Sequence, residues 1–241
     1  MKQAYFNWSS GKDSALALYQ VLAEREFKIT KLVTTVNTDV ARVSMHGLRE
    51  ELLDFQAERL GLPLEKIPLA GNVTMTEYSK ILGAVANRLV SGGNTHTIFG
   101  DIFLEDLKAY REEQLASVGL KAVFPLWKKD TKQLITEFID LGFKAITVCV
   151  NGKYLDESFV GRILDHQFVA DSPKNVDPCG ENGAFHTFVF DGPIFSNSIE
   201  FKIGEKVNRK YEPSESNDDN CFSDDKKPWD TKFWYQDLIL T

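Results

Sequence analysis

The chain has 241 residues, of which 43% are hydrophobic and 26% are charged, and its formal net charge is -7 at pH 7. This length and composition are typical of a globular protein with enough apolar residues for a sizeable core. The acidic balance argues against nucleic acid as the main partner, because nucleic-acid binding depends on cationic contacts to phosphate.

In chain order, the first half alternates strand-like and helix-like segments. An apolar run over residues 3–8 predicts a buried strand, and Ala15, Leu18, Tyr19 and Leu22 then follow at the spacing of one helix face. Similar patterns predict strands over 31–37 and 95–101. Three further helices are predicted: one contains Leu48, Leu52 and Phe55 and ends at 61–63, and one runs from a Thr74–Glu77 capping box to Leu89. The third covers 104–118. This alternation predicts an α/β fold with a mostly parallel sheet covered on both faces.

Polar residues follow the carboxyl ends of three of these strands. They are the segments Ser9–Ser14, Asn37–Asp39 and Gly100–Asp101. Ligands of open parallel sheets bind beyond the carboxyl ends of the strands. We therefore expect the three segments to converge on one crevice.

The second half of the chain has a different pattern. A helix over Leu134–Leu141 and a strand over 144–150 are followed by a loop of turn formers at 172–183. Further strands are predicted over 184–190, 197–203 and 232–240, and the acidic stretch 212–230 is expected to be a mobile surface loop. The change of pattern places a domain boundary near residues 120–130, with one domain over 1–125 and a smaller α+β domain over 126–241.

The segment Ser9–Ser14, "SSGKDS", lies between the first strand and the first helix, where proteins often hold phosphate. It is not a Walker loop, because Phe6 and Asp13 stand where that motif needs Gly and Ser or Thr. Free N–H groups, hydroxyls and Lys12 favour an anion, and Asp13 suggests a bridging Mg²⁺. The alternative is an ordinary serine cap followed by a solvated Lys–Asp pair. The Ser-x-Gly-x-x-Ser spacing favours the phosphate site.

Arg111 lies within the apolar stripe of the helix predicted over 104–118. An arginine in such a stripe is rarely buried unless it is paired. One interpretation is a structural ion pair with Asp101 or Glu137, or a side-chain stem that reaches water. The other is that Arg111 binds a phosphate or a carboxylate in the crevice. Glu105 and Glu112 lie on the opposite face and are expected to be solvated.

The segment 179–187, "CGENGAFHT", places Cys179, Glu181 and His186 around two glycines. Asn182-Gly183 followed by an alternating run is the pattern of a hairpin turn and an ordinary strand. Glu181 and His186 could alternatively supply a general base and a general acid. Cys179 is either a nucleophile or, as more often in such a loop, a small packing residue.

The other cysteines and histidines carry weaker signals. The three cysteines include no Cys-x-x-Cys pair, which indicates neither a disulfide framework nor a zinc site and fits a reducing compartment. Cys149 is expected in the core, and His96 and His166 are expected to be structural or at the surface. His46 either contacts adenine or an acceptor carboxylate or is simply solvated. The sequence shows no signal-peptide layout and no apolar run of about 20 residues, so we expect a cytoplasmic protein without a membrane partner.

The phosphate-loop sequence resembles the Ser-Gly-Gly-x-Asp-Ser loop of the PP-loop ATP pyrophosphatases. That resemblance implies a Rossmann-like sheet that binds ATP, attack of an acceptor oxygen on the α-phosphate, and release of pyrophosphate. Ser10 stands where these enzymes have their first Gly, and a serine fits there if its φ is negative.

Together, this loop, "GDI" at 100–102, "RE" at 111–112, "PLW" at 125–127 and "CGENGAFHT" resemble the diphthine–ammonia ligase family over nearly the whole chain. In that family an ATP-dependent ligase amidates the diphthine side chain of translation elongation factor 2. The sequences of residues 8–14 and of "RVSMHG" at 42–47 look more like those of bacterial relatives, and bacteria lack diphthamide. Ala184 stands where the family usually has an acidic residue.

The resemblance implies roles for specific residues. ATP and pyrophosphate binding is implied for Ser9, Gly11, Lys12, Asp13 and Ser14. From their positions in the predicted crevice we also expect Ser10, Asn37 and Gly100 to contact the nucleotide, and we expect Asp13 to bind Mg²⁺. Active-site roles are implied for Asp101, Arg111, Glu181 and His186.

We therefore expect an ATP-dependent ligase that adenylates a carboxylate and lets ammonia displace AMP. Its acceptor is elongation factor 2 if the host makes diphthamide. The alternatives are an enzyme of the same family with another acceptor, a tRNA-modifying PP-loop enzyme, and a nucleotide-binding protein without turnover. A pI near 5.2 and the missing Cys-x-x-Cys argue against the tRNA-modifying enzyme. The acceptor, the ammonia source and the oligomeric state stay open, a homodimer included.

Overall fold

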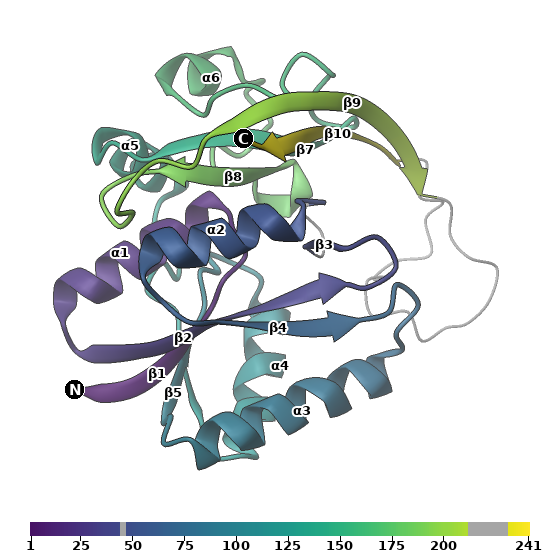
Figure 1. Ribbon diagram of the computed structural model, residues 1–241. Helices are drawn as coiled ribbons and strands as arrows, with labels where there is room; N and C mark the ends of the chain where they lie inside the picture. Colours follow the sequence, from purple (N-terminus) through teal and green to yellow (C-terminus); the bar gives the residue numbers. More distant parts are fainter. Residues whose placement is uncertain (44–46, 212–230) are drawn as a thin grey trace.

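The computed structural model describes residues 1–43, 47–211 and 231–241. It stacks two β-sheets with helices between them and on both outer faces (Figure 1). His46, Cys221 and the stretch 212–230, which was expected to be a mobile loop, lie outside the described residues.

Within the described residues the first sheet has six strands, in the order β3-β2-β1-β5-β6 with β4 also paired to β2. These strands are β1 (Lys2–Asn7), β2 (Phe27–Asn37), β3 (Arg42–Val43), β4 (Leu64–Leu69), β5 (His96–Ile98) and β6 (Lys121–Val123). The pairings are parallel except for that of β3 with β2. The predicted mostly parallel sheet is confirmed.

Helices cover both faces of this sheet. Helices α1 (Lys12–Glu24) and α2 (Glu50–Leu60) lie between the two sheets, whereas α3 (Met75–Ser91) and α4 (Glu105–Ala116) cover the opposite face. The capping box at the start of α3 is confirmed, since Glu77 N donates to Thr74 Oγ1 and Thr74 N donates to Glu77 Oε2.

The predicted apolar face of α1 is partly wrong. Ala15 and Leu18 are buried, but Leu22 is 43% exposed and Val21 is buried instead. Helix α1 packs between two sheets, so its buried face is wide and also includes Leu16 (3% exposed). The second sheet therefore decides which residues of α1 are covered.

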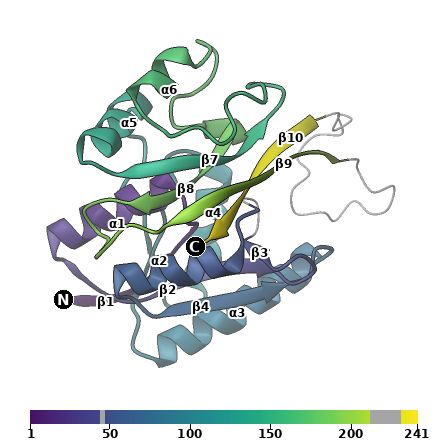
Figure 2. The same cartoon turned by 45° about the horizontal axis from the view of Figure 1, so that its top comes forward.

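The second sheet is antiparallel, in the order β8-β7-β10-β9. Its strands are β7 (Lys144–Asn151), β8 (Phe185–Asp191), β9 (Phe201–Tyr211) and β10 (Thr231–Leu240). Helices α5 (Thr131–Asp140) and α6 (His166–Asp171) lie on its outer side, away from α1 and α2 (Figure 2). The chain is thus an α/β sheet with a second, α+β part, as predicted.

Two apolar clusters hold these layers together. The larger joins α1 and α2 to the second sheet and contains Leu18, Leu52, Ile146 and Phe188. The smaller lies under the first sheet, against α3 and α4. Because one core spans both sheets, the boundary at residue 125 stays a prediction. No helix in the described part of the chain is long and apolar enough to cross a membrane.

Candidate functional site

The phosphate loop, Ser9–Ser14, runs from the end of β1 into the first turn of α1. Gly11 is the N-cap of the helix, with φ -97°. Ser9 Oγ donates to Ser14 Oγ at 3.0 Å, and Ser14 Oγ donates to the carbonyl oxygen of Gly11 at 2.9 Å. The hydroxyls therefore brace the loop at the positive end of the helix dipole, where an anion is favoured.

The expectation of a negative φ at Ser10 is wrong, because its φ is 71°. This left-handed conformation turns the Ser10 carbonyl toward the second sheet. There it accepts from Val189 N and from Gln56 Nε2, both at 3.0 Å. Ser10 thus adopts a backbone conformation that favours glycine.

Lys12 is only 5% exposed, so it is not the solvated lysine of the alternative interpretation. Its Nζ lies 2.7 Å from each carboxylate oxygen of Asp13 and 5.7 Å from the ring centroid of Phe185. Burial alone would lower the pKa of Lys12, but the charge of Asp13, with smaller effects from Cys179 and Glu181, outweighs it and raises that pKa. Lys12 therefore stays charged in an enclosed site.

The backbone N–H of Lys12 already has a partner inside the protein. It donates to Thr187 Oγ1, in β8, at 3.0 Å. The first N–H groups of a helix have no partner within the helix itself. In this loop one of them is used to hold the second sheet.

Gly100 and Asp101 lie against the start of α1. A Cβ on Gly100 would be 2.8 Å from Ser14 N and 2.9 Å from the carbonyl carbon of Asp13, so a larger residue would push the two segments apart. Asp101 then forms an ion pair with Arg111. Two of the three polar segments expected to converge are therefore in contact.

Asn37 lies at the carboxyl end of β2, further along than the pairing of β2 with the end of β1 at Val33. Its Oδ1 accepts from Asp39 N at 2.9 Å, in the turn that follows β2. The expected role of Asn37 in the ATP site stays a prediction.

Arg111 makes the ion pair with Asp101 that was one of its two interpretations. Its guanidinium carbon lies 4.4 Å from the ring centroid of Phe99, so the cation stacks on an aromatic face. Burial raises the pKa of Asp101; Arg111 opposes that shift, and Asp13 adds to it. Because Asp101 already binds one side of Arg111, a ligand would meet the pair rather than a free cation.

We call the segment Asp177–Ala184, which leads into β8, the carboxylate loop. Asp177 orders it: Oδ1 accepts from Cys179 N at 2.8 Å, and Oδ2 accepts from Thr131 Oγ1 at 2.7 Å. Gly180 has φ +75°, and a Cβ there would lie 2.9 Å from the Phe185 ring. These contacts fold the loop tightly over the start of β8.

The hairpin interpretation of Asn182-Gly183 is wrong. Both residues have the positive φ that such a turn needs, 60° and 70°. They lie at a short 3₁₀ turn, η1 (Glu181–Gly183), which leads into β8, whereas the antiparallel partner β7 ends at Asn151. The local turn geometry forms, but it does not join two paired strands.

Glu181 and His186 both have strongly shifted pKa values. The pKa of Glu181 is raised to about 7, first by burial and then by the charge of Asp13, with Lys12 acting in the opposite direction. The pKa of His186 is lowered to about 4 by burial and by Lys12. Near neutral pH, Glu181 is therefore poised to exchange a proton, whereas His186 is a neutral imidazole.

Cys179 behaves as a packing residue. It is 3% exposed, and its Sγ donates to the carbonyl oxygen of Thr131 at 3.3 Å. Burial raises the pKa of its thiol to about 12, so the thiolate that a nucleophile requires is not formed near neutral pH. Cys149 lies in the core, as expected.

Three residues of this site had no assigned role in the sequence. Thr187 contacts the phosphate loop, Asp177 orders the carboxylate loop, and Gln56 bonds to Ser10. The Asp177-Pro178 pair is a turn signal that could have suggested an ordering role. Gln56 carries no such signal, because it is a glutamine inside an amphipathic helix.

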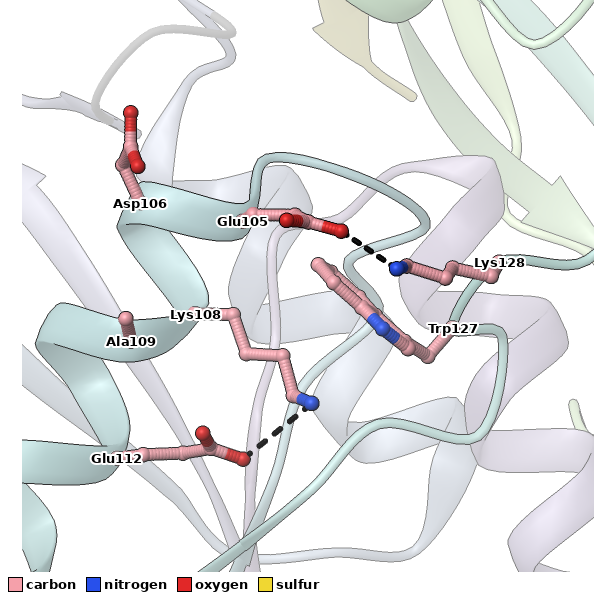
Figure 3. A pocket seen from close by; sticks show the side chains of 7 residues that line it. All are labelled: Glu105, Asp106, Lys108, Ala109, Glu112, Trp127 and Lys128. Atoms are coloured by element: carbon pink, nitrogen blue, oxygen red, sulfur yellow. Dashed lines mark ion pairs between the residues drawn. The ribbon is translucent and has the colours of Figure 1, made fainter.

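A hollow of about 400 Å³ lies between α4 and the segment with Trp127 and Lys128 (Figure 3). Two ion pairs cross it, Lys128 with Glu105 at 2.5 Å and Lys108 with Glu112 at 3.5 Å. The Lys108 ammonium also lies 4.8 Å from the ring centroid of Trp127. The predicted catalytic residues do not line this hollow.

The carboxylates near the phosphate loop are not arranged as a closed metal cage. Among residues 1–43, 47–211 and 231–241, no group of three or more His, Cys, Asp or Glu side chains could hold a metal ion. Mg²⁺ in nucleotide sites is usually bound through one or two carboxylates together with the phosphates. Asp13 and Asp101 suit that arrangement, in which the nucleotide supplies further ligands.

Models of two protein domains match the chain, the diphthamide synthase N-terminal domain over residues 1–122 and the C-terminal domain over residues 130–215. The diphthine–ammonia ligase of Homo sapiens is 25% identical over 221 residues, which cover 83% of this chain and 82% of that protein. The diphthine–ammonia ligase of Schizosaccharomyces pombe is 30% identical over 101 residues, but the matched part is 39% of this chain and 17% of that protein.

Several solved structures overlap part of the fold, and one of them illustrates the extent. It is described as a predicted subunit of tRNA methyltransferase from Methanocaldococcus jannaschii, and it is 14% identical with a TM-score of 0.42. The overlap covers 60% of this chain and 77% of that one. A likeness this slight carries no argument about function.

Proposed function

Since this chain belongs to the diphthamide synthase family, we propose that it is an ATP-dependent ligase that converts a carboxylate into an amide, with release of AMP and pyrophosphate. The observation that carries the proposal is the position of Glu181, a carboxyl with a pKa of about 7, beside the buried Lys12–Asp13 pair of the phosphate loop. A phosphate-binding group and a proton acceptor thus occupy one site.

The first step would activate the carboxylate, which is a poor electrophile until one of its oxygens belongs to a leaving group. A carboxylate oxygen attacks the α-phosphorus of ATP, the bond to the β-phosphate oxygen breaks, and pyrophosphate leaves. Lys12, held charged by Asp13, stabilises the negative charge that develops on the phosphates. The loop braced by the Ser9 and Ser14 hydroxyls, at the N-terminus of α1, orients the triphosphate.

The second step would form the amide. Ammonia attacks the carbonyl carbon of the acyl-adenylate, and AMP leaves with the oxygen that came from the carboxylate. Glu181 takes the proton that the attacking nitrogen loses, a role that suits a pKa of about 7. His186 is neutral at that pH and would orient the acceptor through a hydrogen bond rather than through charge.

Arg111 and Asp101 would contact the substrates at the other side of the site. The guanidinium, stacked on Phe99, suits the oxygens of a phosphate or of the acceptor carboxylate. Mg²⁺, held by Asp13 or Asp101 and the nucleotide, would supply further neutralisation of the phosphate charge.

The test supplies ATP, Mg²⁺, ammonium and candidate carboxylates, and separates AMP from ADP. We expect AMP and pyrophosphate in equal amounts, with amide formed in the same ratio. Sustained formation of ADP without AMP would contradict the proposal.

Isotope labelling sharpens this test. If the acceptor carboxylate carries ¹⁸O, one labelled oxygen is transferred to AMP when the carboxylate is adenylated. AMP that takes its new oxygen from water instead would indicate plain hydrolysis of ATP.

The first acceptor to assay depends on whether the host organism makes diphthamide. Several relatives are named diphthine–ammonia ligase, so diphthine on elongation factor 2 is the first acceptor to assay if the host makes diphthamide. A host without diphthamide would leave the same two steps acting on another carboxylate.

A further inference from the structure

Gln56 joins three parts of the protein at the interface between the two sheets. It is completely buried in α2. Its Oε1 accepts from Trp8 Nε1 at 2.8 Å, and its Nε2 donates to the carbonyl oxygens of Ser10 at 3.0 Å and Val189 at 2.7 Å. A buried amide is costly unless its polar atoms are bonded, so this arrangement fixes both Gln56 and its partners.

One of those partners, Ser10, has a backbone conformation that it would not adopt readily alone. Its φ of 71° is in the left-handed region, which a residue with a Cβ disfavours. Such conformations persist where the surroundings determine them. The Ser10 carbonyl receives two donors here, Gln56 Nε2 and Val189 N. These two bonds hold the strained residue.

A second contact from β8 reaches the other side of Gly11. Thr187 Oγ1 accepts from the backbone N–H of Lys12 at 3.0 Å, and Thr187 is buried. Strand β8 therefore contacts the phosphate loop at Ser10 through Val189 and at Lys12 through Thr187. The second sheet, together with β1 and α1, sets the shape of the loop.

We infer that Gln56 is a positioning residue for ATP: it holds Ser10 in the left-handed conformation and so keeps the phosphate loop in the shape that receives the triphosphate, with Thr187 as the second contact. The inference rests on the proposed function only in taking ATP as the ligand. Gln56 acts through Ser10 and touches no reacting atom.

The first test measures the Kd for Mg·ATP by calorimetry in Gln56→Met, Ser10→Gly and the double variant. Methionine has a similar length but no amide, so we expect the Gln56→Met variant to bind Mg·ATP about tenfold or more weakly. Ser10→Gly in the same chain should restore most of this loss, because glycine adopts a positive φ without the clamp. Gln114→Met, at an exposed position of α4, is the matched control and should bind as the wild type does.

Rescue separates positioning from general damage to the core. If Gln56 were only a packing residue, Ser10→Gly would leave the defect of Gln56→Met unchanged or make it worse. Either result, or a Kd for Gln56→Met equal to that of the wild type, would overturn the inference. In nuclear magnetic resonance spectra, the indole N–H signal of Trp8 should move in Gln56→Met and stay moved in the double variant, since its acceptor is gone in both.

If Gln56→Met does not fold, variants of Thr187 test whether β8 positions the phosphate loop. Thr187→Val keeps the shape and removes the acceptor for Lys12 N–H, whereas Thr187→Ser keeps that acceptor. Weaker Mg·ATP binding in the first variant and near wild-type binding in the second would support positioning by β8. Equal binding in all three proteins would overturn it. Binding of Mg·ATP without AMP formation would remove the proposed function alone, whereas a wild-type chain that does not bind Mg·ATP would overturn this inference.

Discussion

The phosphate loop and the carboxylate loop acquire their chemistry in different ways. In the phosphate loop, the strand end, the helix start and the hydroxyls of Ser9 and Ser14 are near neighbours in the chain and produce an anion site locally. In the carboxylate loop, Glu181 is an ordinary glutamate until folding buries it beside Asp13. The first loop depends on local backbone geometry, and the second depends on what the rest of the chain places next to it.

This difference makes the two loops separable by experiment. A change in the phosphate loop should remove nucleotide chemistry at every pH. A change in the carboxylate loop should alter the pH dependence of both rate and stability.

Lys12→Met should have the largest effect. It removes the positive charge that the phosphate loop places against the phosphates, and it leaves Asp13 without its partner. Loss of one buried group that stabilises developing charge lowers rates by about a thousandfold. We expect a fall of that size in AMP formation at all pH values between 6 and 9, measured by chromatography of the nucleotides.

Lys132→Met, at an exposed position of α5, is the matched control for Lys12→Met and should keep the wild-type rate. If Lys12→Met forms AMP within tenfold of the wild-type rate, the phosphate loop does not work through Lys12.

Glu181→Gln should lower the rate and raise the stability. Loss of the proton acceptor should reduce kcat by about a hundredfold. The wild-type rate should rise with pH through about 7, because Glu181 acts when deprotonated, and the variant should lack that rise. The measurement is kcat from pH 5.5 to 8.5.

Although Glu181→Gln should lower the rate, it should raise the stability of the folded protein above neutral pH. The pKa of Glu181 is raised from 4.5 to about 7 in the folded protein, so the folded state binds this proton more tightly than the unfolded state does. That contribution is complete below pH 4.5 and is lost as the pH rises through about 7. At pH 8 the neutral Gln side chain should therefore increase the free energy of unfolding, by about 2 kcal/mol.

Urea unfolding at pH 4.5 and pH 8 measures this difference. Glu113→Gln, at an exposed position of α4, should change neither rate nor stability by a comparable amount. A Glu181→Gln variant that is less stable than the wild type at pH 8 would show that burial does not penalise the Glu181 carboxylate.

Arg111→Lys tests the geometry of the ion pair at the edge of the site. Lysine keeps the charge but loses the planar group that bonds to Asp101 and stacks on Phe99. We expect kcat/KM to fall about tenfold. The same change at Arg88, in an exposed pair with Glu65, should leave kcat/KM unchanged. An equal rate for Arg111→Lys would assign Arg111 to charge alone.

The two loops also differ in how far the sequence could predict them. The order of strands and helices in the first sheet follows from hydrophobic periodicity and from caps such as Thr74–Glu77, which are local signals. The position of "SSGKDS" at the end of β1 also follows from local signals. The φ of Ser10 does not follow from local signals, because Val189 and Gln56, which are distant in sequence, determine it.

Errors at other positions have the same physical origin. Leu22 fits the helix period but faces away from the second sheet, whose position the period does not contain. Asn182-Gly183 forms its turn, but the strand pairing around it depends on the whole sheet. Asn37 lies at the carboxyl end of β2, which extends beyond the end of β1, and its role in nucleotide binding stays a prediction.

Cys179→Ala should have the smallest effect. The thiol lies within the carboxylate loop, but its pKa of about 12 and its bond to the Thr131 carbonyl indicate a packing role. We expect AMP formation to stay within about threefold of the wild-type rate and the protein to be slightly less stable, because a small buried side chain is shortened. Iodoacetamide should not inactivate the wild-type enzyme at pH 7 through this residue, as mass spectrometry of the modified chain can check. Inactivation that follows alkylation of Cys179 would instead show that this loop, like the phosphate loop, carries a reactive group made by its local geometry.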